Sequence, residues 1–320
     1  MTASSKRIHF PPILNGLDYL ESTVDLLGPK NGEPSAREVK YAVLHLQAAS
    51  ETLFKARLAI EDTKWVWAIP EDYEEVKHKA GDFKSVGWED AIKRIKGKCV
   101  PETEIGPKRA YRALANMRNR FQHFGVSESH TAVEALAIPV LDNLLKFVMV
   151  DLLPNADTDD WFEADRSMER VRAGLGPIKD LVALRLGPIS EQLKEHERST
   201  LACLSCTRFT VMINGSEPVA CALCGRAYGA PSEAAWEYTD TDPYLVAKGR
   251  DSQLVYSCAE CGGAAIRTAV ASAPERESWV CFQYGCEING LCDSCGQAAH
   301  IVFEEASICQ DCLDSRFAKL

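Results

Sequence analysis

Residues 108–125 read KRAYRALANMRNRFQHFG, and their apolar side chains recur with the period of an α-helix. The spacing i, i+3, i+4 and i+7 is shared by Ala110, Leu114, Met117, Phe121 and Phe124. Pro107 suits the first position of a helix, and Gly125 suits a position just past its end. The stretch therefore predicts an amphipathic helix that packs along one side.

The opposite side of this helix is polar and basic. It carries Lys108, Arg112, Asn116, Asn119 and His123, with Arg118 at its border. Arg118 and His123 are five residues apart in the chain, which places them about 140° apart around the helix axis. One helix cannot easily direct both side chains at one phosphate group.

The motif Arg118-Asn119-Arg120-Phe121-Gln122-His123 resembles the signature of HEPN ribonucleases, in which an Arg and usually a polar residue precede a His. Residues 41–67, YAVLHLQAASETLFKARLAIEDTKWVW, also resemble the second helix of HEPN domains. The resemblance covers roughly residues 15–153. It implies a helical bundle that forms a homodimer, so that two copies of the motif meet in one cleft.

The same resemblance implies a metal-independent endoribonuclease. His123 would assist the attack of a ribose 2′-hydroxyl and protonate the leaving 5′-oxygen. Arg118 would stabilise the charge of the phosphorane, and Asn119 would orient the His or the phosphate. Flanking phosphates would be held by Arg112, Arg120 and Lys108. The expected product carries a 2′,3′-cyclic phosphate, and such enzymes in bacteria often serve as toxins or in antiviral defence.

Charge is distributed in a way that favours an anionic partner for the first half. Residues 91–124 contain nine Lys and Arg against two Glu, although the whole chain has a net charge of −10. Residues 1–150 carry 21 basic and 20 acidic groups, whereas residues 151–320 carry 15 and 26. We therefore expect RNA to be bound by the first half of the chain.

The longest apolar stretch is residues 133–153, and it contains Glu134, Asp142, Lys146 and Asp151. A membrane span would not carry so many charged groups, so this stretch predicts a core helix. The N-terminal residues lack the apolar run of a signal peptide. We expect a cytoplasmic protein without a membrane partner, whose thiols are reduced.

The pattern over the first half predicts a mainly α-helical bundle of about four or five helices. A helix is expected over 17–27, and Ser35 and Glu38 form a capping box that opens a long helix reaching Glu61. Further helices are expected over 89–96 and 131–153. The predicted domains are a HEPN-like bundle (1–155), a helical linker (156–200), a first zinc ribbon (201–230), a second linker (231–256) and tandem zinc ribbons (257–320).

Twelve of the thirteen cysteines occur in pairs with the spacing of metal ligands, and Cys99 alone has no near neighbour. The pairs predict three four-cysteine zinc sites in small β-hairpin modules: Cys203, Cys206, Cys221 and Cys224; Cys258, Cys261, Cys281 and Cys286; Cys292, Cys295, Cys309 and Cys312. For the last eight cysteines an interleaved pairing, 258/261 with 292/295 and 281/286 with 309/312, is the alternative. Disulfides are the other alternative, which the expected compartment disfavours.

A glycine follows the second cysteine in CALCG, CAECGG and CDSCG. It permits the positive φ that turns backbone amides toward sulfur. Four thiolates fill the coordination shell of zinc, so we expect structural ions and no metal for catalysis. A filled site also carries a net charge of about −2, which makes the second half a poor surface for phosphate.

A non-enzymatic function is the alternative reading of the same residues. A HEPN-like bundle could dimerise or hold RNA without cleaving it, while the zinc ribbons engage a protein partner or an antitoxin. A zinc-dependent hydrolase is a third reading, and the all-thiolate ligand sets disfavour it.

Overall fold

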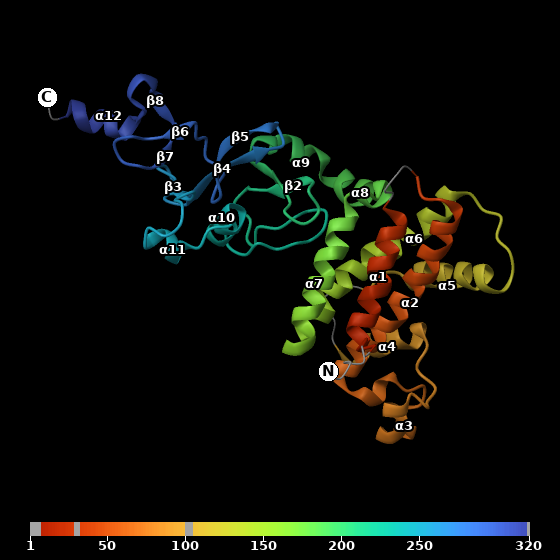
Figure 1. Ribbon diagram of the computed structural model, residues 1–320. Helices are drawn as coiled ribbons and strands as arrows, with labels where there is room; N and C mark the ends of the chain where they lie inside the picture. The colour runs from red at the N-terminus through yellow and green to blue at the C-terminus, as the bar shows by residue number, and fades with distance from the viewer. Residues whose placement is uncertain (1–7, 29–32, 100–104, 319–320) are drawn as a thin grey trace, which may run out of the picture. The chain divides into compact units, whose positions relative to one another are not determined.

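The computed structural model describes residues 8–28, 33–99 and 105–318. The chain is mainly helical, with a small-sheet region toward the C-terminus that carries the three four-cysteine clusters (Figure 1). It divides into two compact units, Met1–Ala183 and Leu184–Leu320.

The first unit is built from helices. Its elements are α1 (Pro12–Leu27), α2 (Ala36–Glu61), η1 (Thr63–Val66), η2 (Pro70–Asp72), α3 (Glu75–Ala80), α4 (Trp88–Lys98), α5 (Lys108–His123), α6 (His130–Phe147), the π-helical turn η3 (Val148–Leu152), η4 (Leu153–Asn155), α7 (Thr158–Leu175) and α8 (Lys179–Leu186), which crosses into the second unit.

Local signals set the start of α2. The Ser35 hydroxyl accepts a hydrogen bond from the Glu38 amide at 3.3 Å, and the Glu38 carboxylate accepts one from the Ser35 amide at 2.7 Å. These bonds satisfy amides that have no partner inside the helix. The long helix expected from Ser35 to Glu61 is therefore confirmed, whereas α1 begins at Pro12, before the expected Leu17.

Helix α2 lies at the centre of the first unit and packs against α1, α4, α5 and α6. Phe54 of α2 is fully buried. Its ring meets the edges of Tyr111 on α5 at 5.4 Å and Phe147 at the end of α6 at 5.1 Å, both between ring centroids. Aromatic contacts of this kind add to the area that they bury, so Phe54 fixes the position of α5 on the core.

The buried side of α5 is close to the predicted apolar side, but it does not include the last predicted residue. Tyr111, Leu114 and Met117 are buried, but Phe124 is 84% exposed. The reason is that α5 ends at His123, so the chain has left the helix at Phe124 and its ring no longer follows the apolar side. The exposed side of α5 runs along the helix and carries Arg112, Asn119 and His123.

The segment predicted as a linker over residues 156–200 contains α7, α8 and α9 (Ser190–Glu195), interrupted near Gly176-Pro177 and Gly187-Pro188. Helix α7 packs closely against α1 within the first unit. A Cβ atom added at Gly174 would lie 2.4 Å from Val24 Cγ1, so only glycine allows this approach.

The second unit is organised by a five-stranded antiparallel sheet with the order β2-β1-β4-β3, and β5 pairs with β4. The elements of this unit after α8, besides α9, are η5 (Gly187–Ile189), η6 (Glu197–Ser199), β1 (Thr200–Ala202), β2 (Phe209–Met212), α10 (Pro231–Thr239), α11 (Pro243–Ala247), β3 (Tyr256–Ser257), β4 (Ala264–Val270), β5 (Ala273–Cys281), β6 (Gly290–Leu291), β7 (Ala298–Ala299), β8 (Ile301–Phe303), η7 (Glu304–Ala306), β9 (Ile308–Cys309) and α12 (Gln310–Phe317).

Strand β1 belongs to the first cysteine hairpin, yet Leu201 in it also pairs with Val270 of β4. The first and second cysteine clusters therefore share one sheet. Strands β6–β7 and β8–β9 form separate two-stranded pieces around the third cluster.

Within the part of the chain that the structure describes, every helix is too short or too polar to span a lipid bilayer.

Truncation of Phe54 should destabilise the first unit strongly. We expect Phe54→Ala to lower the free energy of unfolding by roughly 3–5 kcal/mol, because it removes a fully buried ring that contacts two other helices. Denaturant unfolding followed by circular dichroism measures this change. Ile60→Ala on the same helix, where the side chain is 38% exposed, is the control and should cost much less.

Candidate functional site

Arg118 and Asn119 lie together near the end of α5. The Arg118 guanidinium donates a hydrogen bond to the Asn119 side-chain oxygen at 2.9 Å. Arg118 is half-buried and Asn119 is exposed. This bond uses one of the five N–H donors of the guanidinium, and among the described residues Arg118 has no carboxylate partner.

His123 is the last residue of α5 and is exposed to solvent. Among the described residues no hydrogen bond joins it to Arg118 or Asn119. One chain therefore places the three predicted catalytic residues on the same two turns of a helix, but connects only two of them.

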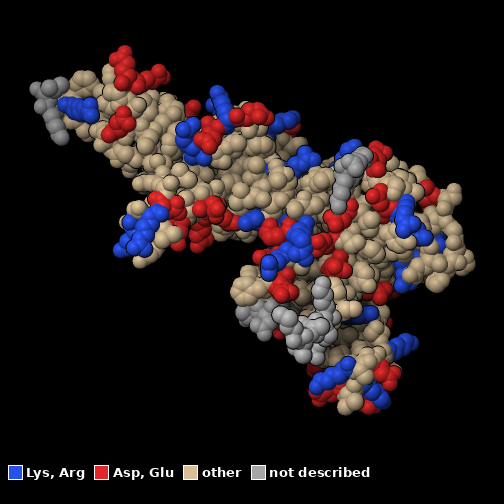
Figure 2. Space-filling model, in the orientation of Figure 1, with Lys and Arg blue, Asp and Glu red and all other residues tan. Residues whose placement is uncertain are grey.

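The cations predicted to hold flanking phosphates are paired in part with carboxylates. Arg112 donates to Glu89 at 2.9 Å, and Arg120 donates to Glu128 at 2.9 Å. Lys108 is half-buried in the first turn of α5. On the face visible in Figure 2, basic and acidic side chains are interspersed, and no large basic patch stands out. The positive balance counted from the sequence is thus partly neutralised by nearby acids.

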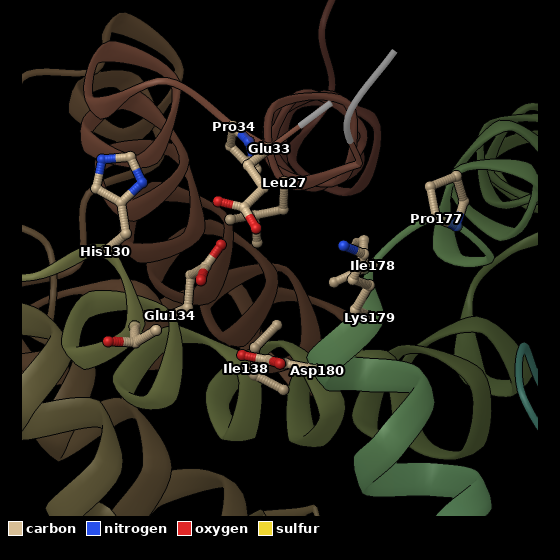
Figure 3. Close-up of a pocket in the computed structure, with 11 residues that line it drawn as sticks. Leu27, Glu33, Pro34, His130, Glu134, Ile138, Pro177, Ile178, Lys179 and Asp180 are labelled. Atoms are coloured by element: carbon tan, nitrogen blue, oxygen red, sulfur yellow. The ribbon is translucent and has the colours of Figure 1, made fainter. Parts of the chain in front are cut away.

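A pocket of about 190 Å³ lies elsewhere in the first unit, between the end of α1, the segment just before α2, the first turns of α6 and the start of α8. Apolar side chains and three carboxylates, from Glu33, Glu134 and Asp180, line it. Figure 3 shows the Glu33 and Glu134 side chains turned toward one another. Burial, together with the charges of Asp180 and Glu33, raises the pKa of Glu134. None of the residues predicted for catalysis or RNA binding lines this pocket.

The twelve paired cysteines form three clusters, and in each the four sulfur atoms lie within 4.8 Å of one another. The groups are Cys203, Cys206, Cys221 and Cys224; Cys258, Cys261, Cys281 and Cys286; Cys292, Cys295, Cys309 and Cys312. The last eight cysteines are therefore grouped in sequential order, and the interleaved arrangement is not adopted. None of the thirteen cysteines is joined in a disulfide.

The sulfur spacing fits a tetrahedral metal ion. A metal–sulfur bond of about 2.3 Å, as for zinc, predicts about 3.8 Å between sulfurs. The Cys203–Cys224, Cys206–Cys221 and Cys261–Cys281 sulfur pairs are 3.5, 3.7 and 3.4 Å apart. The clusters are thus compatible with zinc sites.

Four of the cysteine turns share one backbone geometry. The amide of the first cysteine donates to the carbonyl five residues later, and the amide four residues later donates back to the cysteine carbonyl, at Cys203, Cys221, Cys258 and Cys292. The residue at the fourth position has a positive φ in each turn: Thr207, Gly225, Gly262 and Gly296. The predicted positive φ of the glycines is confirmed, and their amides donate to a cysteine carbonyl; Thr207 adopts the same conformation without being glycine.

The two remaining cysteine pairs use other local structures. In the Cys281–Cys286 loop the Gly285 amide donates to the Cys281 carbonyl at 3.0 Å, and Gly285 again has a positive φ. Cys309 is the N-cap of α12 and Cys312 lies in its first turn. The Cys309 amide donates to the Cys292 sulfur at 3.4 Å. Burial raises the pKa of the Cys292 thiol, but amides including that of Cys309 outweigh it and lower the pKa to about 6.

Side chains outside the cysteine motifs complete the first cluster. The Tyr228 hydroxyl donates to the Cys203 sulfur at 3.2 Å, and the Thr210 hydroxyl lies 3.1 Å from the Cys221 sulfur. Neither residue was predicted from the sequence. Thr210 lies on β2 and Tyr228 in the segment before α10, and neither position is marked by the cysteine spacing.

A Ser–His pair joins α1 to α2. The Ser22 hydroxyl lies 2.8 Å from His45 Nδ1, and the His45 ring is flanked by Tyr19 and Tyr41. Burial lowers the pKa of His45, although nearby Asp18 opposes this effect. His45 thus serves as a link between two helices.

No family model, curated protein or solved structure matches the chain.

Substitution at Thr207 tests the geometry of the cysteine turns. A β-branched residue at positive φ is strained, so Thr207→Gly should stabilise the second unit by about 1 kcal/mol. Gly262→Ala is the matched reverse change, because nothing lies within 4 Å of the added Cβ and only the backbone conformation opposes it. It should destabilise by about 1 kcal/mol. Thermal unfolding measures both, and changes of the opposite signs would contradict the shared geometry.

Neutralisation of Glu134 should stabilise the first unit in a pH-dependent way. Because its pKa is raised in the folded state, the ionised carboxylate opposes folding at neutral pH, and this cost vanishes as the pH falls below the ordinary value of 4.5. Glu134→Gln should therefore raise the free energy of unfolding at pH 7. The increase should be only about 0.5 kcal/mol, because solvent screens a partly exposed group. At pH 4 the substitution should leave the free energy of unfolding almost unchanged. Urea unfolding at both pH values provides the comparison.

Proposed function

We propose that the protein is a homodimeric, metal-independent endoribonuclease whose active site is formed by Arg118, Asn119 and His123 from two protomers. The observation that carries the proposal is the exposed end of α5. There Arg118 is held by Asn119, its remaining N–H donors are not paired with a carboxylate among the described residues, and His123 is open to solvent.

The chemistry follows from these side chains. An imidazole transfers protons near neutral pH, as removal of a 2′-hydroxyl proton and protonation of a 5′-oxygen require. A guanidinium stabilises charge that develops on the phosphorane oxygens. The angular separation of Arg118 and His123 supports a dimer, since a second α5 would bring the missing side chain to the other side of the phosphate. The expected product is a 2′,3′-cyclic phosphate.

The flanking arginines can bind RNA phosphates if they leave their carboxylate partners. Arg112 and Arg120 are 58% and 45% exposed in their ion pairs with Glu89 and Glu128. Exposed ion pairs are worth about 0–1 kcal/mol, so a phosphate competes with the carboxylate at little cost.

We further propose that each cysteine cluster holds one structural zinc ion. The donor set supports this identity, because four thiolates in a tetrahedral arrangement select a soft or borderline ion and close its coordination shell. Bound zinc supplies folding free energy and no open coordination position. The second unit then acts in regulation or partner recognition, and RNA cleavage is assigned to the first. A role as a toxin or antiviral effector rests on the HEPN resemblance.

The ion pairs of Arg112 and Arg120 favour a second candidate. Two of the predicted phosphate ligands are neutralised within the chain, as expected of a helical module that binds RNA or protein without cleaving it. The two candidates differ in whether RNA is cut.

Cleavage of mixed RNA by the purified, zinc-loaded chain tests the proposal. We expect activity without added metal and during brief chelation, with loss of roughly 100-fold or more in His123→Ala and in Arg118→Ala. His130→Ala, which changes an exposed His at the start of α6, is the control and should keep full activity. Absence of cleavage, or cleavage that survives both substitutions, would leave the binding module as the function.

Metal analysis tests the zinc assignment separately. The purified chain should contain close to three zinc ions, one for each cluster in the structure. Cys224→Ser should remove one ion and destabilise the second unit by several kcal/mol, because a closed site supplies on the order of 10 kcal/mol. A chain that is folded and free of metal would contradict the assignment.

A further inference from the structure

The three cysteine clusters differ in how far their sulfurs are shielded from solvent. In the first cluster all four cysteines are buried, with exposed fractions of 1–3%. The second has two buried and two half-buried cysteines. In the third cluster Cys292 and Cys309 are buried, Cys312 is half-buried and Cys295 is exposed.

Protein also covers the first cluster more completely. The hydroxyls of Tyr228 and Thr210 contact its sulfurs, and the Tyr228 ring packs against Tyr238 of α10 at 5.2 Å between centroids. For the third cluster, the buried neighbours beyond its own cysteines are Ala299 and Ile301, with Ala259 packed against them. Cys295 itself is exposed.

The β-structure around the third cluster is also less extensive than that around the first. The first cluster is attached to the five-stranded sheet through β1 and β2, whereas β6, β7, β8 and β9 pair only two at a time. The backbone link from this region to the second cluster is the isolated bridge between Cys258 and Ala298, where the Ala259 amide donates to the Ala298 carbonyl at 2.9 Å. Local opening is therefore least costly at the third cluster.

We propose that Cys292, Cys295, Cys309 and Cys312 form an exchangeable metal site, and that Cys295 is the position at which chelators and electrophiles attack it. This inference rests on the zinc assignment made above. An incoming ligand must approach the ion, and an electrophile must reach a sulfur lone pair, so both reactions occur first where sulfur is exposed. The site would take a soft or borderline divalent cation such as Zn²⁺ or Cd²⁺.

Alkylation of Cys295 is a nucleophilic substitution at carbon. With iodoacetamide, the Cys295 sulfur attacks the methylene carbon, a C–S bond forms, the C–I bond breaks and iodide leaves. The thioether product is a poor ligand, so the donor set falls from four thiolates to three and the affinity for the ion drops. The change is confined to the last module, because the other clusters share no cysteine with it.

Metal transfer from the full-length, zinc-loaded chain to a neutral chromophoric chelator tests the proposal. We expect one ion to be released in a fast phase, about tenfold or more ahead of the other two. In parallel, limited iodoacetamide treatment followed by peptide mapping should label Cys295 before any cysteine of the first cluster. Labelling should coincide with loss of one ion in native mass spectrometry.

Two variants locate the fast phase. Cys295→Ser should start with two ions and show only the slow release, while its circular dichroism stays close to that of the parent chain. Cys206→Ser, in the buried first cluster, should keep the fast phase. Release of three ions in one phase, retention of the fast phase in Cys295→Ser, or first labelling of Cys203, Cys206, Cys221 or Cys224 would each overturn the proposal. Absence of bound zinc at the outset would instead contradict the zinc assignment.

Discussion

Four sulfur atoms held within 4.8 Å of one another are the constraint on which the second unit depends. As thiolates they repel one another, and as thiols they form only weak hydrogen bonds, so the zinc ion proposed for their centre would stabilise them. The strands around them have two to nine residues and could not hold so small a core alone. Backbone amides contribute as well, because the turns at Cys203, Cys221, Cys258 and Cys292 close through the same pair of hydrogen bonds.

The first unit depends in the same way on one central helix. Helix α2 contacts α1, α4, α5 and α6, and Phe54 connects its centre to Tyr111 and Phe147. Since α5 is fixed by contacts on its buried side, its polar side is presented to solvent in a defined direction. The residues proposed for catalysis lie on that polar side, and their positions therefore follow from packing in the core. This connects a fold determined by apolar contacts to a chemistry carried by exposed groups.

The sequence predicted best those features that depend on neighbouring residues. The capping box of Ser35 and Glu38, the glycines at 225, 262 and 296 after three of the cysteine pairs, and the course of α5 are all local, and the structure contains them. The offset at Phe124 arose because periodicity alone does not show where a helix stops. The mainly helical first half and the cysteine-bearing small sheets were also predictable, since long periodic segments and paired cysteines each have one common structural explanation.

Features that depend on contacts between distant residues were not predictable. Nothing near Arg112 indicates its pairing with Glu89, and nothing near Cys203 indicates the hydroxyl of Tyr228. The choice between sequential and interleaved clusters likewise depended on strand pairing, because Cys286 and Cys292 are close enough in the chain to serve either arrangement. Helix α10 was missed because a short amphipathic segment among polar residues gives a weak periodic signal.

The pairing of Leu201 with Val270 has a consequence for how such a chain can evolve. Two cysteine hairpins that share a sheet cannot be exchanged singly, because recombination between them would leave each half with an unpaired strand edge. Residues 200–281 would therefore be inherited as one block, whereas the terminal piece with its own two-stranded ladders could be gained or lost without breaking that sheet.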